Sequence, residues 1–410
     1  MHEAPLRLRV ENRLAAIPAA EWDACAGENR TSPNADAALS PDGHMPPAIP
    51  DARANPFVTH AFLSALEDSG SATAKTGWLP QHLVLEDAEG RILGACPAYL
   101  KSHSRGEYVF DEGWADAYER AGGRYYPKLQ VSVPFTPATG PRLLARPGAG
   151  EAAVRGALAQ GLTALAELRS ASSVHATFLR PDDAGALEAV GFLPRTDQQF
   201  HWHNEGYGSF EDFLGALASR KRKAIRRERR EAVESGIDIR WLTGSDITEE
   251  ALDAFFAFYQ ETGSRKWGRP YLTRSFYSLV TERMADRILL VMARRAGRWI
   301  AGAINFIGAG TLFGRHWGAI EHHPFLHFEV CYHQAIEYAI AHRLRVVEAG
   351  AQGEHKLARG YLPVTTRSAH WIADPGLRQA VADYLQRERV YVACRFRRSS
   401  GRVSNRHPAS

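Results

Sequence analysis

The chain has 410 residues, of which 45% are hydrophobic and 23% charged, and its formal net charge is +4. These proportions exclude a fibrous or wholly disordered protein, and no apolar run approaches the roughly 18–20 residues that a membrane-spanning helix needs. The amino-terminal residues do not resemble a signal peptide, and the four cysteines include no CxxC pair, which argues against a disulfide scaffold or a zinc ribbon. We expect a cytoplasmic protein of two or three domains.

A short strand and a long loop are the first elements expected along the chain. Residues 6–10 have the pattern of a strand. Residues 27–56 are rich in Ala, Pro, Asn and Asp and poor in large apolar side chains. This composition is typical of a mobile loop, either inert or acting as a lid, and not of a linker between domains.

An internal repeat follows. In each half of the chain we expect a β-hairpin whose turn ends in Gly-Arg and whose return strand contains Gly-Ala, then a long helix, a short strand and a Gly-aromatic-Leu-Pro corner. These elements fall at residues 83–96, 151–168, 174–179 and 191–194 in the first half, and at residues 289–303, 328–342, 345–348 and 360–363 in the second. Four elements in the same order predict two copies of one α/β fold, rather than a chance similarity of short apolar pieces.

The repeat gives the expected domain boundaries. We predict an amino-terminal domain over residues 1–200, a carboxy-terminal domain over residues 201–394 and a basic, flexible tail over residues 395–410. Gly94 and Gly302 would then occupy equivalent places in the two hairpins, because each follows a Gly-Arg turn.

One segment is strongly basic in a chain that is otherwise mildly acidic outside its tail. Residues 220–230 hold eight basic residues and one Glu, and Ser219 and Gly236 are placed to cap a helix. Such a helix is a solvated face, a contact to an acidic neighbouring domain or a site for phosphates such as those of tRNA. No aromatic residue is interleaved to stack bases, and we expect no binding to DNA.

Polar and titratable residues are concentrated where the strands of the second half end and its long helix begins. They lie at residues 314–318, 327–329 and 348–360. Ligands of α/β sheets bind at such strand ends. The alternative to a ligand site is a loop whose charges pair with one another.

The chemistry of these side chains suits transfer to an amine. A carboxylate or imidazole can take the proton from an attacking amine, and cations can hold a phosphate or a developing oxyanion. The expected bases are Glu329, Glu354 and His355. The expected substrate-binding residues are Arg315, Trp317, Gln352, Lys356 and Arg359.

The same region is rich in histidine, with His316, His322, His323, His327 and His333. His323 and His327 have helical spacing, but Pro324 argues against a continuous helix between them. We therefore expect loop and supporting histidines and no metal site. Cys331 is expected to be a small, buried hydrophobic residue.

The sequence resembles the bacterial predicted N-acyltransferases related to the FemAB-like peptidoglycan aminoacyl transferases. The resemblance lies in the runs 126–144, 314–318, 327–329 and 350–363, and it covers nearly the whole chain apart from residues 27–56 and the basic tail. It implies two tandem domains of the acetyltransferase-like (GNAT) fold, with mixed, mostly antiparallel sheets flanked by helices. It also implies transfer of an acyl or aminoacyl group to an amine, such as that of a peptidoglycan precursor or a peptide.

Two classes of donor, acyl-CoA and aminoacyl-tRNA, are compatible with the sequence. A typical GNAT has the motif Gln/Arg-x-x-Gly-x-Gly/Ala before a helix, where backbone amides hold the pyrophosphate of coenzyme A. We find no convincing copy of it here, which leaves aminoacyl-tRNA beside acyl-CoA as the donor. In either case the donor is a substrate, and no bound cofactor is expected.

We therefore expect an α/β protein of two tandem GNAT-like domains that acts as an N-acyltransferase. One alternative is a non-catalytic recognition protein that binds a peptide, a cell-wall precursor or RNA. Another is an acetyl-CoA enzyme that acts on a small amine. An enzyme would be favoured if Glu329 and Glu354 faced a shared cleft.

Overall fold

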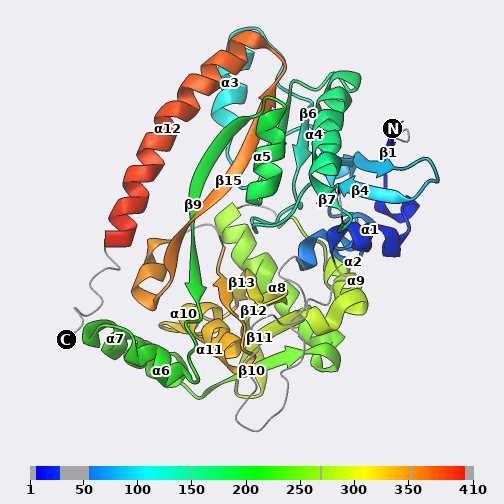
Figure 1. Ribbon diagram of the computed structural model, residues 1–410. Helices are drawn as coiled ribbons and strands as arrows, with labels where there is room; N and C mark the ends of the chain where they lie inside the picture. Colours follow the sequence, from blue (N-terminus) through cyan, green and yellow to red (C-terminus); the bar gives the residue numbers. More distant parts are fainter. Residues whose placement is uncertain (1–5, 28–54, 149, 268–269, 351–352, 402–410) are drawn as a thin grey trace. The chain divides into compact units, whose positions relative to one another are not determined.

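The computed structural model describes residues 6–27, 55–148, 150–267, 270–350 and 353–401 (Figure 1). Side chains are described for these residues except at 266–267, 354 and 398–401. The predicted loop at residues 27–56 therefore lies outside the described residues except at its two ends. The chain forms two compact units: unit 1 comprises Met1–Asp197 with Thr366–Tyr391, and unit 2 comprises Gln198–Thr365 with Val392–Ser410.

Unit 1 contains two groups of paired strands. The first has the order β1-β3-β4-β7 and is antiparallel; its strands are β1 (Arg7–Glu11), β3 (His82–Glu86), β4 (Ile92–Cys96) and β7 (Leu144–Ala145). The second has the order β15-β8-β6-β5-β2; its strands are β2 (Trp78–Pro80), β5 (Ala98–Lys101), β6 (Lys128–Val131), β8 (Ser173–Ala176) and the end of β15 (Leu362–Ile372). Here β6 and β8 are parallel, and the crossover between them contains α4 (Glu151–Leu168), whose bounds are those predicted.

The helices of unit 1 bury both faces of the second group of strands. Apolar residues of β6 and β8, such as Leu129 and Val174, pack against Leu158 and Leu162 of α4 on one face. The remaining helices and helical turns are η1 (Leu14–Ala16), α1 (Ala19–Ala26), η2 (Pro56–Val58), α2 (His60–Asp68), η3 (Ala74–Thr76), α3 (Glu112–Arg120), α5 (Pro181–Ala189) and α12 (Pro375–Gly401). A separate apolar cluster joins Trp114 of α3 to Leu385 of α12.

Unit 2 has the strand order β10-β11-β12-β13-β14-β9. Its strands are β10 (Ile237–Thr243), β11 (Ile288–Arg295), β12 (Arg298–Ile307), β13 (Thr311–Ala319), β14 (Val346–Glu348) and the end of β9 (Leu193–His203). Neighbours are antiparallel except β13 and β14, which are parallel. As in unit 1, the chain crosses between the parallel strands through a helical segment.

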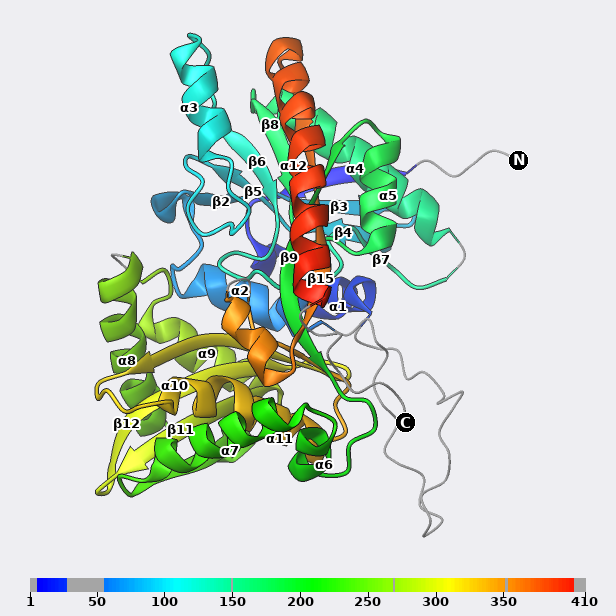
Figure 2. The ribbon, with the colours of Figure 1, turned by 90° about the vertical axis from the view of Figure 1, so that its left-hand side faces the viewer.

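Helices cover both faces of these strands. Figure 2 shows α8 and α9 on one side of β11 and β12, and α7 and α11 on the other. The helices and helical turns of unit 2 are α6 (Phe210–Gly215), α7 (Ser219–Val233), η4 (Gly244–Asp246), α8 (Glu249–Trp267), α9 (Arg274–Met284), η5 (Ala285–Arg287), α10 (Leu326–Phe328), η6 (Glu329–His333), α11 (Gln334–Ala341) and η7 (Glu354–Arg359). The basic segment 220–230 forms most of α7, as predicted.

Each unit takes its last strand from a segment that begins in the other unit. β9 begins in unit 1, and its end pairs with β14 of unit 2, with Trp202 opposite Val347. β15 begins in unit 2, and its end pairs with β8 of unit 1, with His370 opposite His175. An unpaired strand edge leaves N–H and C=O groups without partners, and these pairings cover the edges of β14 and β8.

This exchange changes the predicted domain boundaries. The expected boundary near residue 200 falls close to residue 197, where unit 1 first ends, but residues 366–391 of the expected second domain belong to unit 1. Residues 395–401 of the expected flexible tail are helical, because α12 continues to Gly401. The remainder of that tail, residues 402–410, lies outside the described residues.

Candidate functional site

The parallel strands of unit 2 part from each other next to a cavity. Their pairing runs from Thr311–Val346 to Phe313–Glu348, whereas β13 continues to Ala319. A cavity of about 100 Å³ lies beside the continuing part of β13. It is lined by Ala303, Asn305, Gly314, Arg315, His316, Trp317, His327, Cys331, Tyr332 and Ala349. The chain thus brings together the predicted segments 314–318 and 327–329 at one place.

A π-helical turn supplies one wall of this cavity. η6 spans Glu329–His333, between the α-helical segments α10 and α11. A π-turn inserts a residue into the helical repeat and so rotates the side chains that follow it; such turns are frequent at functional sites. Here the turn presents Cys331 and Tyr332 to the cavity. The prediction for Cys331 is therefore corrected, because this side chain is half-buried and lines the cavity.

Tyr332, in the wall of the cavity, is paired with His355, which is exposed. The Tyr332 Oη and the His355 Nε2 are 3.0 Å apart. Burial raises the pKa of Tyr332, which keeps its hydroxyl protonated. Partial desolvation, together with the charges of Arg359 and Lys356, lowers the pKa of His355 and favours the neutral imidazole. In the tautomer that carries its proton on Nδ1, the Tyr332 hydroxyl can donate this hydrogen bond to the His355 Nε2.

Aromatic rings surround this pair. The ring centroids of Trp317 and His327 are 5.3 Å apart, those of His327 and Tyr332 5.5 Å, and those of Phe328 and His355 5.6 Å. A larger groove of about 650 Å³ shares Trp317 and His327 with the cavity and continues along residues 319–328 and α8. The site can therefore receive a small reacting group in the cavity and a more extended ligand in the groove.

A family model described as FemAB-like, peptidoglycan biosynthesis/recognition, matches residues 13–407. The chain belongs to the FemAB-like family. The crystal structure of FemX matches with a TM-score of 0.53 and 11% identity, over 89% of this chain and 98% of that chain. This likeness shows the fold, and the predicted class of two GNAT-like α/β halves is confirmed, as is the resemblance to the family.

Two other solved structures are similar at lower scores. A tandem GNAT protein from the clavulanic acid biosynthesis pathway has a TM-score of 0.42 and 15% identity, over 90% of this chain and 98% of that chain. L-PGS from Bacillus licheniformis has a TM-score of 0.48 and 9% identity, over 78% of this chain and 95% of that chain. No curated protein matches the sequence.

In this FemAB-like protein, Glu329 is engaged in an ion pair. Its carboxylate is 2% exposed and accepts hydrogen bonds from Arg229 Nε and Nη2 at 3.0–3.2 Å and from Gln334 Nε2 at 2.7 Å. Arg229 belongs to α7, so the pair joins the basic helix to η6. Glu329 is not among the residues that line the cavity.

Arg359 is held in a similar way. Its guanidinium donates to both carboxylate oxygens of Glu228, at 2.8 and 3.1 Å, and lies 3.4 Å from the centre of the Phe328 ring. Glu228 belongs to α7 as well. The ion-pair partners of Glu329 and Arg359 are thus charges of α7, not other charges of the predicted polar segments.

Lys356 is buried beside the pair of Tyr332 and His355. Its Nζ donates to the Gly350 carbonyl at 2.9 Å and lies 6.0 Å from the centre of the Tyr332 ring. Burial lowers the pKa of Lys356 to about 8. The predicted Gln352 and the side chain of Glu354 lie outside the described residues, so their roles stay predictions.

Sequence reasoning missed Tyr332, Asn305 and the placement of His327. Tyr332 lies within an apolar helical pattern, where a tyrosine is most simply a packing residue. Only the π-turn directs it toward the cavity. The signal that could have located Tyr332 and His327 is the density of aromatic and imidazole groups between residues 316 and 333, whereas no such signal marks Asn305.

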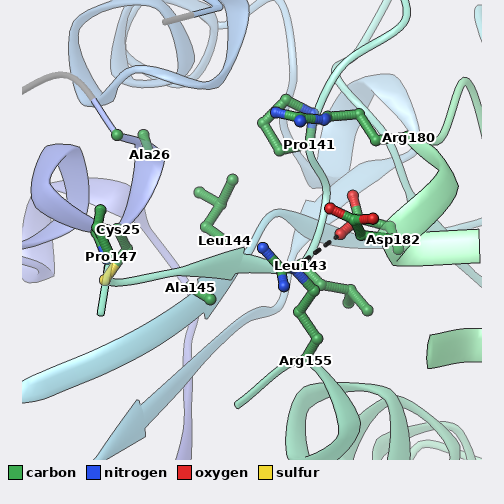
Figure 3. Close-up of a pocket in the computed structure, with 12 residues that line it drawn as sticks. Cys25, Ala26, Pro141, Leu143, Leu144, Ala145, Pro147, Arg155, Arg180 and Asp182 are labelled. Carbon is green, nitrogen blue, oxygen red and sulfur yellow. Dashed lines mark ion pairs between the residues drawn. The ribbon is translucent and has the colours of Figure 1, made fainter. Parts of the chain in front are cut away.

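Metal binding and membrane insertion find no support in the described part of the chain. Within it, no group of three or more His, Cys, Asp and Glu side chains lies close enough to hold a metal ion. Among the described helices, none is long and apolar enough to cross a membrane. A further cavity, in unit 1, has only about 30 Å³, and Arg155 faces the Asp183 carboxylate there at 3.7 Å (Figure 3). That volume suits about a single water molecule rather than a substrate.

Proposed function

We propose that this FemAB-like protein is an N-acyltransferase whose reaction takes place in the cavity beside β13 and η6. It moves an acyl or aminoacyl group from an activated ester or thioester to an amine. The observation that carries the proposal is the hydrogen-bonded pair of Tyr332 and His355, with Tyr332 in the cavity wall. A neutral imidazole behind a protonated phenol is a proton relay suited to amine attack.

The relay works in two directions. As the amine nitrogen bonds to the donor's carbonyl carbon, the Tyr332 hydroxyl takes the amine proton and passes its own proton to His355 Nε2. When the carbonyl carbon separates from the leaving oxygen or sulfur, the proton returns from His355 through Tyr332 to that atom. The products are an amide and an alcohol or thiol, and both side chains regain their starting protonation.

Cations near the site suit a donor that carries phosphates. Arg315 lines the cavity, and Lys356 lies behind Tyr332. α7 is tied to η6 and η7 by ion pairs and exposes further basic side chains, namely Arg220, Lys223, Arg226, Arg227 and Arg230. Both acyl-CoA and aminoacyl-tRNA carry phosphates, and the long row of exposed cations favours the tRNA. The family description favours an amine of a peptidoglycan precursor or a peptide as acceptor.

The test is a transfer assay on the purified protein. Acyl-CoA and aminoacyl-tRNA are each supplied with muropeptide amines, and the new amide is followed by mass spectrometry. Tyr332→Phe keeps the ring and removes the hydroxyl, so we expect turnover to fall about 10²–10⁴-fold, the usual contribution of proton transfer. The matched control is Tyr338→Phe in α11, which should stay near wild type.

Two results would contradict the relay. Full turnover in both Tyr332→Phe and His355→Gln would remove it, and a large loss in Glu354→Gln alone would transfer the role of base to that carboxylate. Thermal stabilisation by a muropeptide without turnover from either donor would favour a recognition protein, because a ligand that binds the native state raises stability by mass action.

A further inference from the structure

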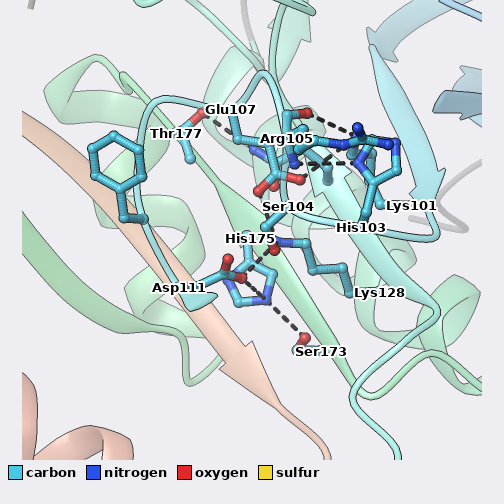
Figure 4. Close-up of polar contacts among 12 residues, drawn as sticks. Lys101, His103, Ser104, Arg105, Glu107, Asp111, Lys128, Ser173, His175 and Thr177 are labelled. Carbon is cyan, nitrogen blue, oxygen red and sulfur yellow. Dashed lines mark hydrogen bonds and ion pairs between the residues drawn. The ribbon is translucent and has the colours of Figure 1, made fainter. Parts of the chain in front are cut away.

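A group of buried charges lies in unit 1, outside the site described above (Figure 4). Lys101 of β5 and Lys128 of β6 are directly opposite each other in the antiparallel pairing, and both are 0% exposed. Like charges opposite each other on neighbouring strands repel, and buried charges are costly unless they are paired. Two lysines in this position therefore need anions nearby.

The anions and most other partners come from one irregular loop, residues 102–111. Lys128 Nζ donates to Ser104 Oγ at 2.8 Å, to Glu107 Oε2 at 2.7 Å and to Asp111 Oδ2. Lys101 Nζ donates to the Arg105 carbonyl at 3.2 Å. Its remaining neighbours are the Trp78 ring, 3.5 Å from Nζ, and Glu107 Oε1 at 3.7 Å. Movement of residues 102–110 would take Glu107 away from both ammonium groups and leave Asp111 as the anion beside Lys128.

The fit between the loop and the strands is incomplete. Glu107 is 3% exposed, yet its Oε1 has no hydrogen-bond partner. On the face of β6 that carries Lys128, the buried Gln130 Oε1 and Ser132 Oγ also lack partners. A buried polar atom without a partner calls for an explanation, such as stored strain, an ordered water or a ligand. Glu107 therefore balances the charge of the lysines without satisfying the surrounding polar groups.

We propose that Lys101 and Lys128 form a binding site for a ligand carboxylate, and that Glu107 is the internal carboxylate which such a ligand replaces. The ligand carboxylate would lie between the two Nζ atoms, and residues 102–110 of the loop would move away from β5 and β6, while Asp111 stays in place through its hydrogen bond from Tyr125. Asp111 would remain on Lys128, so the site keeps one negative charge and favours a single carboxylate over a more highly charged anion.

The protonation of the pair supports an exchangeable contact. Burial lowers the pKa of Lys101 to about 7, and burial raises the pKa of Glu107 to about 7. Near neutral pH both groups are therefore only partly charged, and their mutual attraction is weaker than that of a full ion pair. This inference concerns unit 1 alone and does not depend on the transfer reaction proposed for unit 2.

Opening of the loop can be measured by proteolysis of the full-length protein. Arg105 is exposed at the surface of the loop, so trypsin cleavage after Arg105, followed by mass spectrometry, reports the open fraction. The probe is propionate, which copies the end of the Glu107 side chain. Because the ligand binds only the open loop, ten times its dissociation constant should raise cleavage about tenfold. In Glu107→Gln the internal competitor is weakened, and the response should reach half its maximum at a lower propionate concentration.

The controls separate carboxylate binding from general effects. Propionamide has the same shape without the charge, and sodium chloride at matched ionic strength copies the salt; neither should raise cleavage. Lys101→Met should abolish the response while its thermal unfolding remains cooperative. Cleavage that is insensitive to propionate in both wild type and Glu107→Gln would overturn the proposal and reduce the cluster to a structural lock. An equal response to propionamide would overturn it as well.

Discussion

The two units share a strand arrangement, but the polar residues beside it are buried in unit 1 and line a cavity in unit 2. Each has a parallel strand pair joined by a helical crossover, β6 and β8 in unit 1 and β13 and β14 in unit 2. In unit 1, the polar residues beside the pair are sealed beneath loop 102–111, whereas in unit 2 they line a cavity. The difference teaches that the segments covering the strands, and not the topology, determine which polar groups can reach a ligand.

From this comparison we expect substitutions of the buried charges in unit 1 to lower the free energy of unfolding, and substitutions of the polar groups at the cavity of unit 2 to lower turnover. The largest stability effect is expected for Lys128→Met, because it leaves Glu107 and Asp111 buried near each other without their cation. We expect a loss of about 3–5 kcal/mol in the free energy of unfolding, measured with urea. Arg240→Gln breaks an exposed pair with Asp238 and is the control, with an expected loss of at most about 1 kcal/mol. Equal losses in both variants would contradict the contrast.

Gly318→Ala tests the support of the strand that lines the cavity. A Cβ at Gly318 would lie 2.1 Å from the Phe258 carbonyl oxygen, so α8 would have to move away from β13. We expect a loss of about 1–3 kcal/mol in unfolding free energy, the usual cost of overpacking. Gly113→Ala in α3 meets no atom within 4 Å and should be neutral or stabilising. An unchanged midpoint of unfolding for Gly318→Ala would show that α8 does not press on β13.

Glu329→Gln distinguishes a structural role of Glu329 from a catalytic one. Because the carboxylate is bound by Arg229 and Gln334, the change should lower the unfolding free energy by about 1.5–3 kcal/mol, the range for a hydrogen bond to a charged group. Turnover measured at a temperature where the variant is folded should stay close to wild type. Glu337→Gln removes the other, more exposed partner of Arg229 and is the matched control. A turnover loss of about 100-fold in Glu329→Gln would instead make this residue the base.

The smallest expected effect is a pH slope. The folded-state pKa of Glu107 is raised to about 7 from its ordinary 4.5, so between these values the native state binds more protons than the unfolded state. This contribution to stability is complete below pH 4.5 and is lost as the pH rises through 7. The free energy of unfolding should therefore decrease more between pH 5 and pH 7 in wild type than in Glu107→Gln. Equal slopes would show that Glu107 titrates normally.

Local patterns in the sequence were sufficient to predict most elements and to indicate the region of the candidate cavity. The apolar spacing of residues 151–168 predicted α4 with its observed bounds, and the basic helix and both hairpins formed where they were expected. The crowding of polar residues between 314 and 360 indicated a part of the chain that contributes to the wall of the cavity. These features depend on helix and strand periodicity and on turn residues, which are properties of neighbouring residues.

Only the tertiary structure decided which side chains meet. The exchange of β9 and β15 between the units, the pairing of Glu329 and Arg359 with α7, and the burial of Lys101 opposite Lys128 all join residues distant in the sequence. The π-turn that directs Tyr332 to the cavity departs from regular helical periodicity. Periodicity gives the face on which a residue lies, whereas the charges and rings that it meets depend on long-range packing, so the partners of each site residue could not be obtained from the sequence.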